Sequence, residues 1–338
     1  MIFLTHEKVF SLTNSRMRTV IFDEDPIYSL LKMTVVQSAD LRALLAYLRG
    51  KRNPALQPII DYAESVLLTD GGIKERDQDF RLVSIMGLIQ NDNAPKFQSP
   101  IASIFSSHFY HKNRDGNITC LERRALNPDR KYIILSATAN ETIYRKLFGE
   151  RLHFTDLSST ETKGKLILHY EKSYSRACIA QLGKEEFIRA VTGDVSTHGL
   201  DGVIVYKAHE EQRGTERFVI GTDVPVFCHY GIQYGLNGFS GKRIGIYGVP
   251  HKPDEVYKMY GRALGMDANE EMCICEVERN GFEFSLWTYE NAEMKELQLW
   301  MLESELMQAV GRARLVSEPD AAVHLFSNYP LPGCILPE

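Results

Sequence analysis

Five short apolar runs constrain the fold of this chain more than any other feature of its sequence. Each run is apolar on both faces and ends abruptly at polar or small residues, which is typical of parallel strands that helices cover on both sides. Helical spacing falls between them, at 176–191 and 291–310, and this alternation predicts an α/β fold. The runs span residues 19–22, 132–135, 203–206, 244–249 and 323–326.

The carboxyl ends of such strands are where ligands bind in an open parallel sheet. Asp23 and Ser136 follow two of the runs directly, and Gly248 lies near the end of another. The sequence therefore places its candidate functional residues at the ends of strands rather than on the helices between them.

The chain has 338 residues, of which 44% are hydrophobic and 25% charged, and this suits two soluble domains of medium size. We expect a first domain at 1–150 and a second at 165–330. The link between them is expected near 149–164, which is polar and prone to turns.

Two local patterns add detail to these domains. Residues 27–130 separate the first two strand runs and contain helical spacing, so they read as a mostly helical insertion in the first domain. In the second domain, Asn280-Gly281 lies between two alternating segments and predicts a β-hairpin at about 272–289.

Charge and cysteine content exclude some classes of protein. The net charge of −5 is inconsistent with a uniformly basic nucleic-acid coat, so any such contact needs a local track. The six cysteines include no Cys-x-x-Cys pair, which favours a reducing, cytoplasmic location, and Cys273 and Cys275 should share one face of a strand. No apolar run approaches the length of a membrane span.

Three motifs follow one another along the chain. An acidic group ends the first apolar run in Val20-Ile-Phe-Asp-Glu-Asp-Pro26, and Asp25-Pro26 reads as a turn. A Ser-Ala-Thr sequence ends the second run, in Ile134-Leu-Ser-Ala-Thr-Ala-Asn140. The third, Gln308-Ala-Val-Gly-Arg-Ala-Arg314, closes a long helical pattern.

This ordered set resembles the motifs of superfamily 2 helicases of the DEAD/DEAH-like type. The resemblance covers about residues 1–328 apart from the insertion, and it implies tandem RecA-like parallel-sheet domains, the first of them incomplete. It also implies ATP and Mg²⁺ in the cleft between the domains and single-stranded or duplex nucleic acid across them, with DNA favoured over RNA. The insertion then either caps the first domain or grips a strand of nucleic acid.

The resemblance assigns roles to residues of this chain. Asp23 would hold Mg²⁺ through water, Glu24 would orient the attacking water, and Arg312 or Arg314 would stabilise developing charge, with the choice between the arginines open. Gln308 would assist catalysis from the same helix end. The implied nucleotide contacts are Ser136, Thr138, Gly235 and Asn237, and the implied nucleic-acid contacts are Thr5, His6 and Lys207.

The chain departs from the helicase pattern at its most important phosphate-binding element. The Walker A loop, which should precede the acidic pair, is absent, and Gly241-Lys242 does not replace it because a strand run follows it and Arg243 stands where Ser or Thr is needed. Residues 2–4 already look like a core strand, so we expect an N-terminally truncated motor that exposes apolar sheet surface and is inactive alone. Alternatives are one half of a split motor, completed by a separate chain carrying Walker A, or a non-catalytic nucleic-acid-binding remnant.

Overall fold

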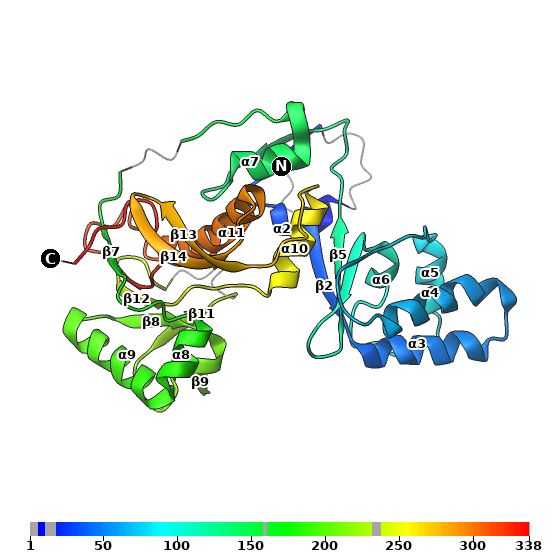
Figure 1. Ribbon diagram of the computed structural model, residues 1–338, viewed down its shortest axis with the longest axis horizontal. Helices are drawn as coiled ribbons and strands as arrows, with labels where there is room; N and C mark the ends of the chain where they lie inside the picture. The colour runs from blue at the N-terminus through cyan, green and yellow to red at the C-terminus, as the bar shows by residue number, and fades with distance from the viewer. Residues whose placement is uncertain (1–5, 11–17, 158–160, 232–237, 338) are drawn as a thin grey trace. The chain divides into compact units, whose positions relative to one another are not determined.

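The computed structural model describes residues 6–10, 18–157, 161–231 and 238–337, which form two compact units (Figure 1). Unit 1 comprises Met1–Gly149 and Pro253–Asn269, and unit 2 comprises Glu150–Lys252 and Glu270–Glu338. The chain leaves unit 1 at Gly149, where the sequence suggests that a linker begins. The chain returns to unit 1 at Pro253–Asn269, and the sequence analysis does not predict this return.

Unit 2 is built on a five-stranded, all-parallel sheet with the strand order β11-β8-β12-β15-β7. The three apolar runs predicted in this half of the chain are central strands of that sheet, shifted by no more than two residues. The strands are β7 (Lys165–His169), β8 (Gly202–Val205), β11 (Val226–His229), β12 (Arg243–Tyr247) and β15 (Ala322–Phe326).

Both faces of this sheet are buried, as the apolar runs predict. Ile204 packs into the core beneath α11 (Ala292–Gly311), whereas its neighbours Val203 and Val205 pack into a second core beneath α8 and α9. Figure 1 shows these helices on opposite sides of the sheet. The predicted helix at 176–191 is in fact two helices, α8 (Arg176–Leu182) and α9 (Lys184–His198), because Gly183 adopts a φ of +86° between them.

The predicted hairpin is confirmed as β13 (Cys273–Arg279) paired with β14 (Phe282–Thr288). Asn280 and Gly281 between the strands have φ values of +54° and +81°, the left-handed pair that a two-residue hairpin turn requires. A second hairpin, β9 (Glu210–Arg213) with β10 (Glu216–Val219), follows a short 3₁₀ turn at Lys207–His209.

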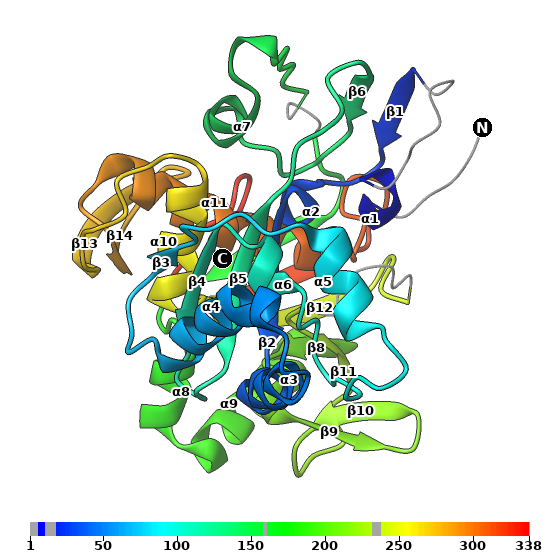
Figure 2. The ribbon, with the colours of Figure 1, turned by 90° about the vertical axis from the view of Figure 1, so that its right-hand side faces the viewer.

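Unit 1 contains a two-stranded parallel sheet of β1 (Thr19–Phe22) and β6 (Lys131–Ile134). These strands match the first two apolar runs, and Figure 2 shows α7 (Glu141–Phe148) beside them. Val20 and Phe22 face a small core that Tyr132 and Ile134 complete. Short helices, α1 (His6–Val9) and α2 (Ile27–Leu30), flank β1.

The segment at 27–130 is rich in helix, as expected, but it also contains an antiparallel sheet that the sequence analysis missed. Its strand order is β2-β5-β4-β3, and its apolar residues pack with those of α3 and α4 in one core. The strands are β2 (Leu31–Val36), β3 (Lys74–Glu75), β4 (Phe109–Lys112) and β5 (Ile118–Arg123). The helices are α3 (Ser38–Gly50), α4 (Gln57–Leu68), α5 (Leu82–Ile89) and α6 (Ser103–Ser106), with a 3₁₀ turn at Pro54–Leu56.

The returning segment supplies α10 (Asp254–Ala263), which packs against β4 and β5 of that antiparallel sheet. Arg123 donates a hydrogen bond to the carbonyl of Ala263 at 3.1 Å, and Arg262 donates to that of Ile73, also at 3.1 Å. These bonds fasten the end of α10 to the middle of the insertion, at Ile73, and to its last strand, at Arg123.

Within the described ranges, no helix is both long and apolar enough to cross a membrane. All six cysteines are free thiols, and the Sγ atoms of Cys273 and Cys275 lie 3.4 Å apart on one face of β13, as predicted.

Gly248, directly after β12, should tolerate no side chain. Its φ is +95°, and an added Cβ would lie 2.4 Å from the carbonyl oxygen of Tyr174 and 2.5 Å from the hydroxyl of Tyr206. We expect Gly248→Ala to lower the free energy of unfolding by about 3 kcal/mol through strain and overpacking. Urea unfolding followed by tryptophan fluorescence reports on unit 2, because both tryptophans of the chain, Trp287 and Trp300, lie there.

The matched control for this substitution is Gly193→Ala, in the exposed middle of α9, where an added Cβ meets nothing within 4 Å. Alanine is the better helix former, so this variant should be neutral or more stable by up to about 1 kcal/mol. Equal destabilisation by the two substitutions would contradict the inference that the close surroundings of Gly248 exclude a side chain.

Candidate functional site

The loop after β1 presents two exposed carboxylates and anchors itself with a third. Asp23 and Glu24 follow the strand directly and are exposed to solvent. Asp25 turns inward, and its Oδ1 accepts hydrogen bonds from the amide of Ile27 at 2.9 Å and from the hydroxyl of Tyr144 at 2.5 Å. The anchored third residue fixes the backbone from which the first two project.

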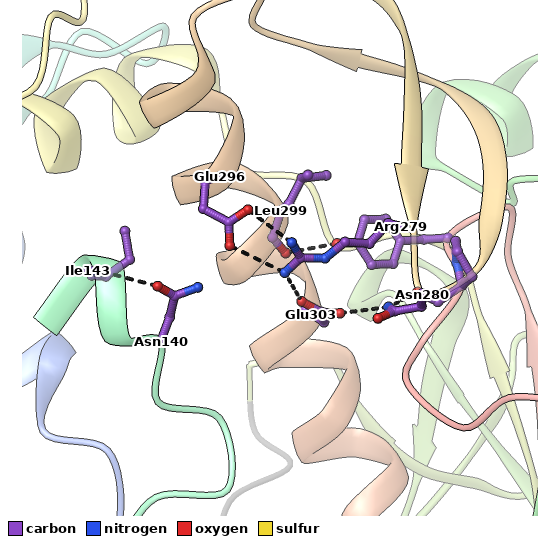
Figure 3. Close-up of polar contacts among 9 residues, drawn as sticks. Asn140, Ile143, Arg279, Asn280, Glu296, Leu299 and Glu303 are labelled. Carbon is purple, nitrogen blue, oxygen red and sulfur yellow. Dashed lines mark hydrogen bonds and ion pairs between the residues drawn. The ribbon is translucent and has the colours of Figure 1, made fainter. Parts of the chain in front are cut away.

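The loop after β6 is attached to the same carboxylate. The hydroxyl of Ser136 donates to Asp25 Oδ2 at 3.2 Å, and the amide of Thr138 donates to Ser136 Oγ at 3.1 Å. The next helix, α7, begins where the side chain of Asn140 accepts from the amide of Ile143 at 3.1 Å (Figure 3). The two loops that carry the acidic and Ser-Ala-Thr motifs are therefore joined at the ends of paired parallel strands.

Burial decides the protonation behaviour of Asp25. Loss of solvent raises the pKa of this carboxyl above its ordinary value of 3.8, and this effect outweighs the hydrogen bonds from Tyr144, Ile27 and Ser136, which lower it. The charge of His6, in α1, acts in the lowering direction as well. Asp25 thus holds its proton more tightly in the folded protein than in the unfolded chain.

The outer face of the β1–β6 sheet is exposed and apolar. Ile21, Ile133 and Leu135 have 59%, 37% and 54% of their surface accessible to solvent. Parallel sheets are almost always covered on both faces, so this surface is suited to packing against further polypeptide.

In unit 2, the long helix α11 is braced against the hairpin that precedes it (Figure 3). Arg279 forms ion pairs with Glu296 at 2.9 Å and with Glu303 at 2.6 Å, two turns apart on the helix. Asn280 donates to Glu303 at 2.8 Å, and the hydroxyl of Tyr329 donates to the carbonyl of Leu299 at 3.0 Å. The hairpin and α11 are therefore held as one body.

The third motif occupies the far end of α11. Gln308 and Arg312 lie one helical turn apart and both are half-buried. The Nε of Arg312 is buried and has no hydrogen-bond partner among the residues that the structure describes. Arg314 is exposed and has a φ of +56°, a left-handed conformation that costs a non-glycine residue about 1–2 kcal/mol.

The other predicted residues are scattered. The ring of His6 packs edge-on against Phe22 at 5.3 Å between centroids, which places it near the acidic loop. Lys207 is exposed just beyond the end of β8. Thr5, Gly235 and Asn237 lie outside the described residues.

The rejection of Gly241-Lys242 as a phosphate loop is confirmed in part by the strand order. The strand β12 begins at Arg243, after the glycine, whereas a phosphate loop needs the strand before it. The amide of Gly241 instead donates to the carbonyl of Ala313 at 3.2 Å, which ties this turn to the end of the Gln308–Arg314 motif.

Each unit gathers its own share of the predicted residues. Unit 1 joins the loops that carry Asp23, Glu24, Ser136 and Thr138, and unit 2 places Gln308, Arg312 and Arg314 at one end of α11. That the two sets line one cleft stays a prediction.

Sequence reasoning missed the residues that organise the site. Asp25 read as part of an Asp-Pro turn, yet it is the acceptor that joins the two loops, and Tyr144 was not considered. One signal for Tyr144 was present in the sequence. Asn140 begins α7, and Tyr144 follows one helical turn later, close enough to the strand ends for its phenol to reach them.

No protein-family model matches this chain, and no curated protein matches it. Solved structures with a similar fold include XPD_APO, with a TM-score of 0.50 and 12% identity, covering 94% of this chain and 72% of that one. The structure of S. tokodaii Xpd4 gives a TM-score of 0.47 at 12% identity, with 88% and 68% covered, and XPD_Helicase gives 0.48 at 12%, with 93% and 65% covered. The α/β fold of this chain is thus shared with XPD_APO, and identity this low establishes the fold alone.

The raised pKa of Asp25 predicts a pH dependence of stability. A carboxyl that binds its proton more tightly when folded contributes stability that is complete below its unfolded pKa and is lost as pH rises through its folded pKa. Asp25→Asn keeps the acceptor for Tyr144 and Ile27 but cannot ionise, so it should gain stability relative to the wild type as pH rises from about 3.8 upward.

Thermal unfolding of unit 1, followed by circular dichroism across this pH range, measures the effect, and tryptophan fluorescence of unit 2 is the internal reference. Tyr144→Phe removes a hydrogen bond that lowers the pKa of Asp25, so it should widen the window in which stability falls. If the difference in unfolding temperature between the wild type and Asp25→Asn is constant with pH, Asp25 is not the titrating group.

Proposed function

We propose that this chain is the motor portion of an ATP-dependent superfamily 2 helicase or translocase acting on single-stranded or duplex nucleic acid, with DNA preferred to RNA. The observation that carries this proposal is the shared carboxylate of Asp25, which joins the acidic loop to the Ser136 loop at the ends of β1 and β6. A nucleotide site at strand ends needs such a rigid edge, and the motif order along the chain supports the same reading.

The exposed acids suit a magnesium nucleotide. Mg²⁺ keeps most of its waters and takes few protein carboxylates, which fits the exposed Asp23, and the bound ion would neutralise phosphate charge. Glu24, fixed on the same backbone, would orient the attacking water. In this proposal Arg312 is the arginine that stabilises developing charge, since its Nε has no hydrogen-bond partner among the described residues, while Arg314 shapes the turn.

Units 1 and 2 would then be the first and second RecA-like domains, approaching each other around ATP. The phosphates also require a cradle of backbone amides and a lysine, and none of the four Gly-Lys pairs of this chain is followed by Ser or Thr. We propose that a polypeptide segment outside these residues supplies that loop, either in the same protein or as a separate chain. The exposed apolar face of Ile21, Ile133 and Leu135 supports this need for a further packing partner.

Nucleic-acid binding should be modest and strongly dependent on salt, because contacts to the phosphate backbone release counterions. The slope of log K against log salt concentration measures this dependence. For binding of a labelled single strand, Lys207→Gln should reduce the magnitude of that slope by about 0.7. Lys165→Gln is the matched control, since Lys165 is exposed at the opposite end of the same parallel sheet. Binding that ignores salt, or equal effects of the two substitutions, would contradict this mode, and parallel titrations with DNA and RNA strands test the preference.

ATP hydrolysis by this chain alone should be negligible. After fusion to, or mixing with, a segment that carries a Gly-x-x-x-x-Gly-Lys-Ser/Thr loop, nucleic-acid-stimulated hydrolysis should appear. In that active form, Glu24→Gln should slow hydrolysis by about 100-fold or more while ATP binding is kept. Arg312→Ala should slow it by about 1,000-fold.

The control for the arginine is Arg189→Ala, an exposed position on α9, which should leave the rate unchanged. Robust hydrolysis by the unmodified chain that Glu24→Gln abolishes would overturn the requirement for a supplied loop. A complemented chain that binds nucleic acid but never hydrolyses ATP would instead favour the non-catalytic binding module.

A further inference from the structure

Three histidines from distant parts of the sequence gather at one edge of the parallel sheet in unit 2. His169 ends β7, His198 ends α9, and His324 lies in β15. Their ring centroids are 4.8 Å apart for His169 and His198, 4.6 Å for His198 and His324, and 5.3 Å for His169 and His324. None of them belongs to the motifs on which the proposed motor function depends.

Strand register and helix length together produce this gathering. His169 pairs with Phe326, two residues beyond His324, so His169 and His324 point to the same face of the sheet. That face is the one that α9 covers, and α9 ends at His198 because Gly199 adopts a left-handed φ of +60°. The end of the helix thus stands over the two strand histidines.

The nitrogen atoms of the three rings converge. One nitrogen from each ring can be chosen so that all three lie within 4.8 Å of one another. Two imidazole nitrogens bound to one tetrahedral ion at about 2.1 Å are about 3.4 Å apart, so modest rotation of the rings would bring the set to bonding distance. Since His198 is half-buried, a fourth position can be reached by water.

The most informative atom is Nε2 of His324. Its residue is 3% exposed, and this nitrogen is buried without a hydrogen-bond partner among the described residues. The other nitrogen of the same ring, Nδ1, lies 3.0 Å from Nε2 of His169 in a hydrogen bond. Buried polar atoms are almost always paired, so a buried nitrogen without a partner, in a ring that belongs to a cluster of three imidazoles, points to a ligand.

Ordinary packing accounts for only part of the arrangement. Phe326 stacks on His169 with centroids 4.5 Å apart, which is favourable for any aromatic ring and needs no nitrogen. Arg243 lies near the cluster, and its charge opposes a bound cation, although its Nε is occupied by the carbonyl of His198 at 3.2 Å. Burial lowers the pKa of His324 to about 3, so this ring is neutral and able to act as a ligand at neutral pH.

We propose that His169, His198 and His324 bind one divalent transition-metal ion of the zinc type. Three imidazoles without a thiolate suit zinc, cobalt, nickel or copper rather than magnesium or calcium, which prefer oxygen ligands. The ion ties the edge strand β7 and its neighbour β15 to the end of α9, and so stabilises unit 2.

The test uses the full chain, prepared without a polyhistidine tag and treated with a chelator. Titration with Co²⁺, followed by its visible absorption, and with Zn²⁺, followed by calorimetry, should give one ion per chain. Zn²⁺ should also raise the unfolding temperature reported by tryptophan fluorescence, because both tryptophans lie in unit 2.

Two substitutions remove ligands without removing the fold. His324→Asn retains a polar atom near the Nδ1 position, which pairs with His169, but lacks Nε2. His198→Gln changes a half-buried side chain at a helix end. Each should weaken metal binding by more than about 100-fold, since loss of an outer partner alone often costs 10–100-fold.

The control is His209→Gln, a half-buried histidine of the same unit whose ring packs on Phe187. It should bind the metal as the wild type does. If His324→Asn fails to fold, as circular dichroism without metal would show, His198→Gln alone decides the outcome. A wild-type chain that binds no ion, or binding that survives His198→Gln unchanged, would overturn the proposal.

Discussion

Parallel strands need cover on both faces, and this requirement shapes both units. Unit 2 meets it completely, because alternate residues of its central strands enter a core beneath α11 and another beneath α8 and α9. The β1–β6 sheet of unit 1 meets it on one face, where Val20 and Phe22 are buried, and leaves Ile21 exposed on the other. In unit 1 the same parallel arrangement brings the loops after β1 and β6, which carry the candidate site residues, to one edge of the sheet.

At that edge of unit 1, the carboxylate of Asp25 holds the two loops together, and those of Asp23 and Glu24 are exposed to solvent. Removing a carboxylate from water is costly, and the hydrogen bonds that Asp25 receives from Ile27, Ser136 and Tyr144 offset only part of that cost, so its pKa stays raised. A buried group that holds several hydrogen bonds makes its loops rigid. Asp23 and Glu24 gain fixed positions from it without losing their own hydration.

The sequence predicts those parts of the fold that local pattern determines. The strand runs, the long helix α11 and the Asn280-Gly281 hairpin each carry their signal within a few residues, and each is confirmed. The antiparallel sheet in the insertion was missed because β2 and β5 pair across more than eighty residues and β2 begins directly after α2. The same limit hid the bond between Tyr144 and Asp25, 119 residues apart, and that between His169 and His324, 155 apart. Such contacts depend on how elements pack, which no short window of sequence reports.

The bracing of α11 gives unit 2 a mechanical property. The helix has 20 residues and is therefore about 30 Å long. The hairpin holds it through Arg279 at Glu296 and Glu303, and Gln308 lies in its last turn with Arg312 just beyond it. Leu299, Leu306 and Val310 along this helix are also buried in the core of unit 2. Because protein interiors are close-packed, the hairpin, α11 and the motif at the end of α11 form one rigid piece, and Gln308 and Arg312 keep a fixed position relative to the hairpin.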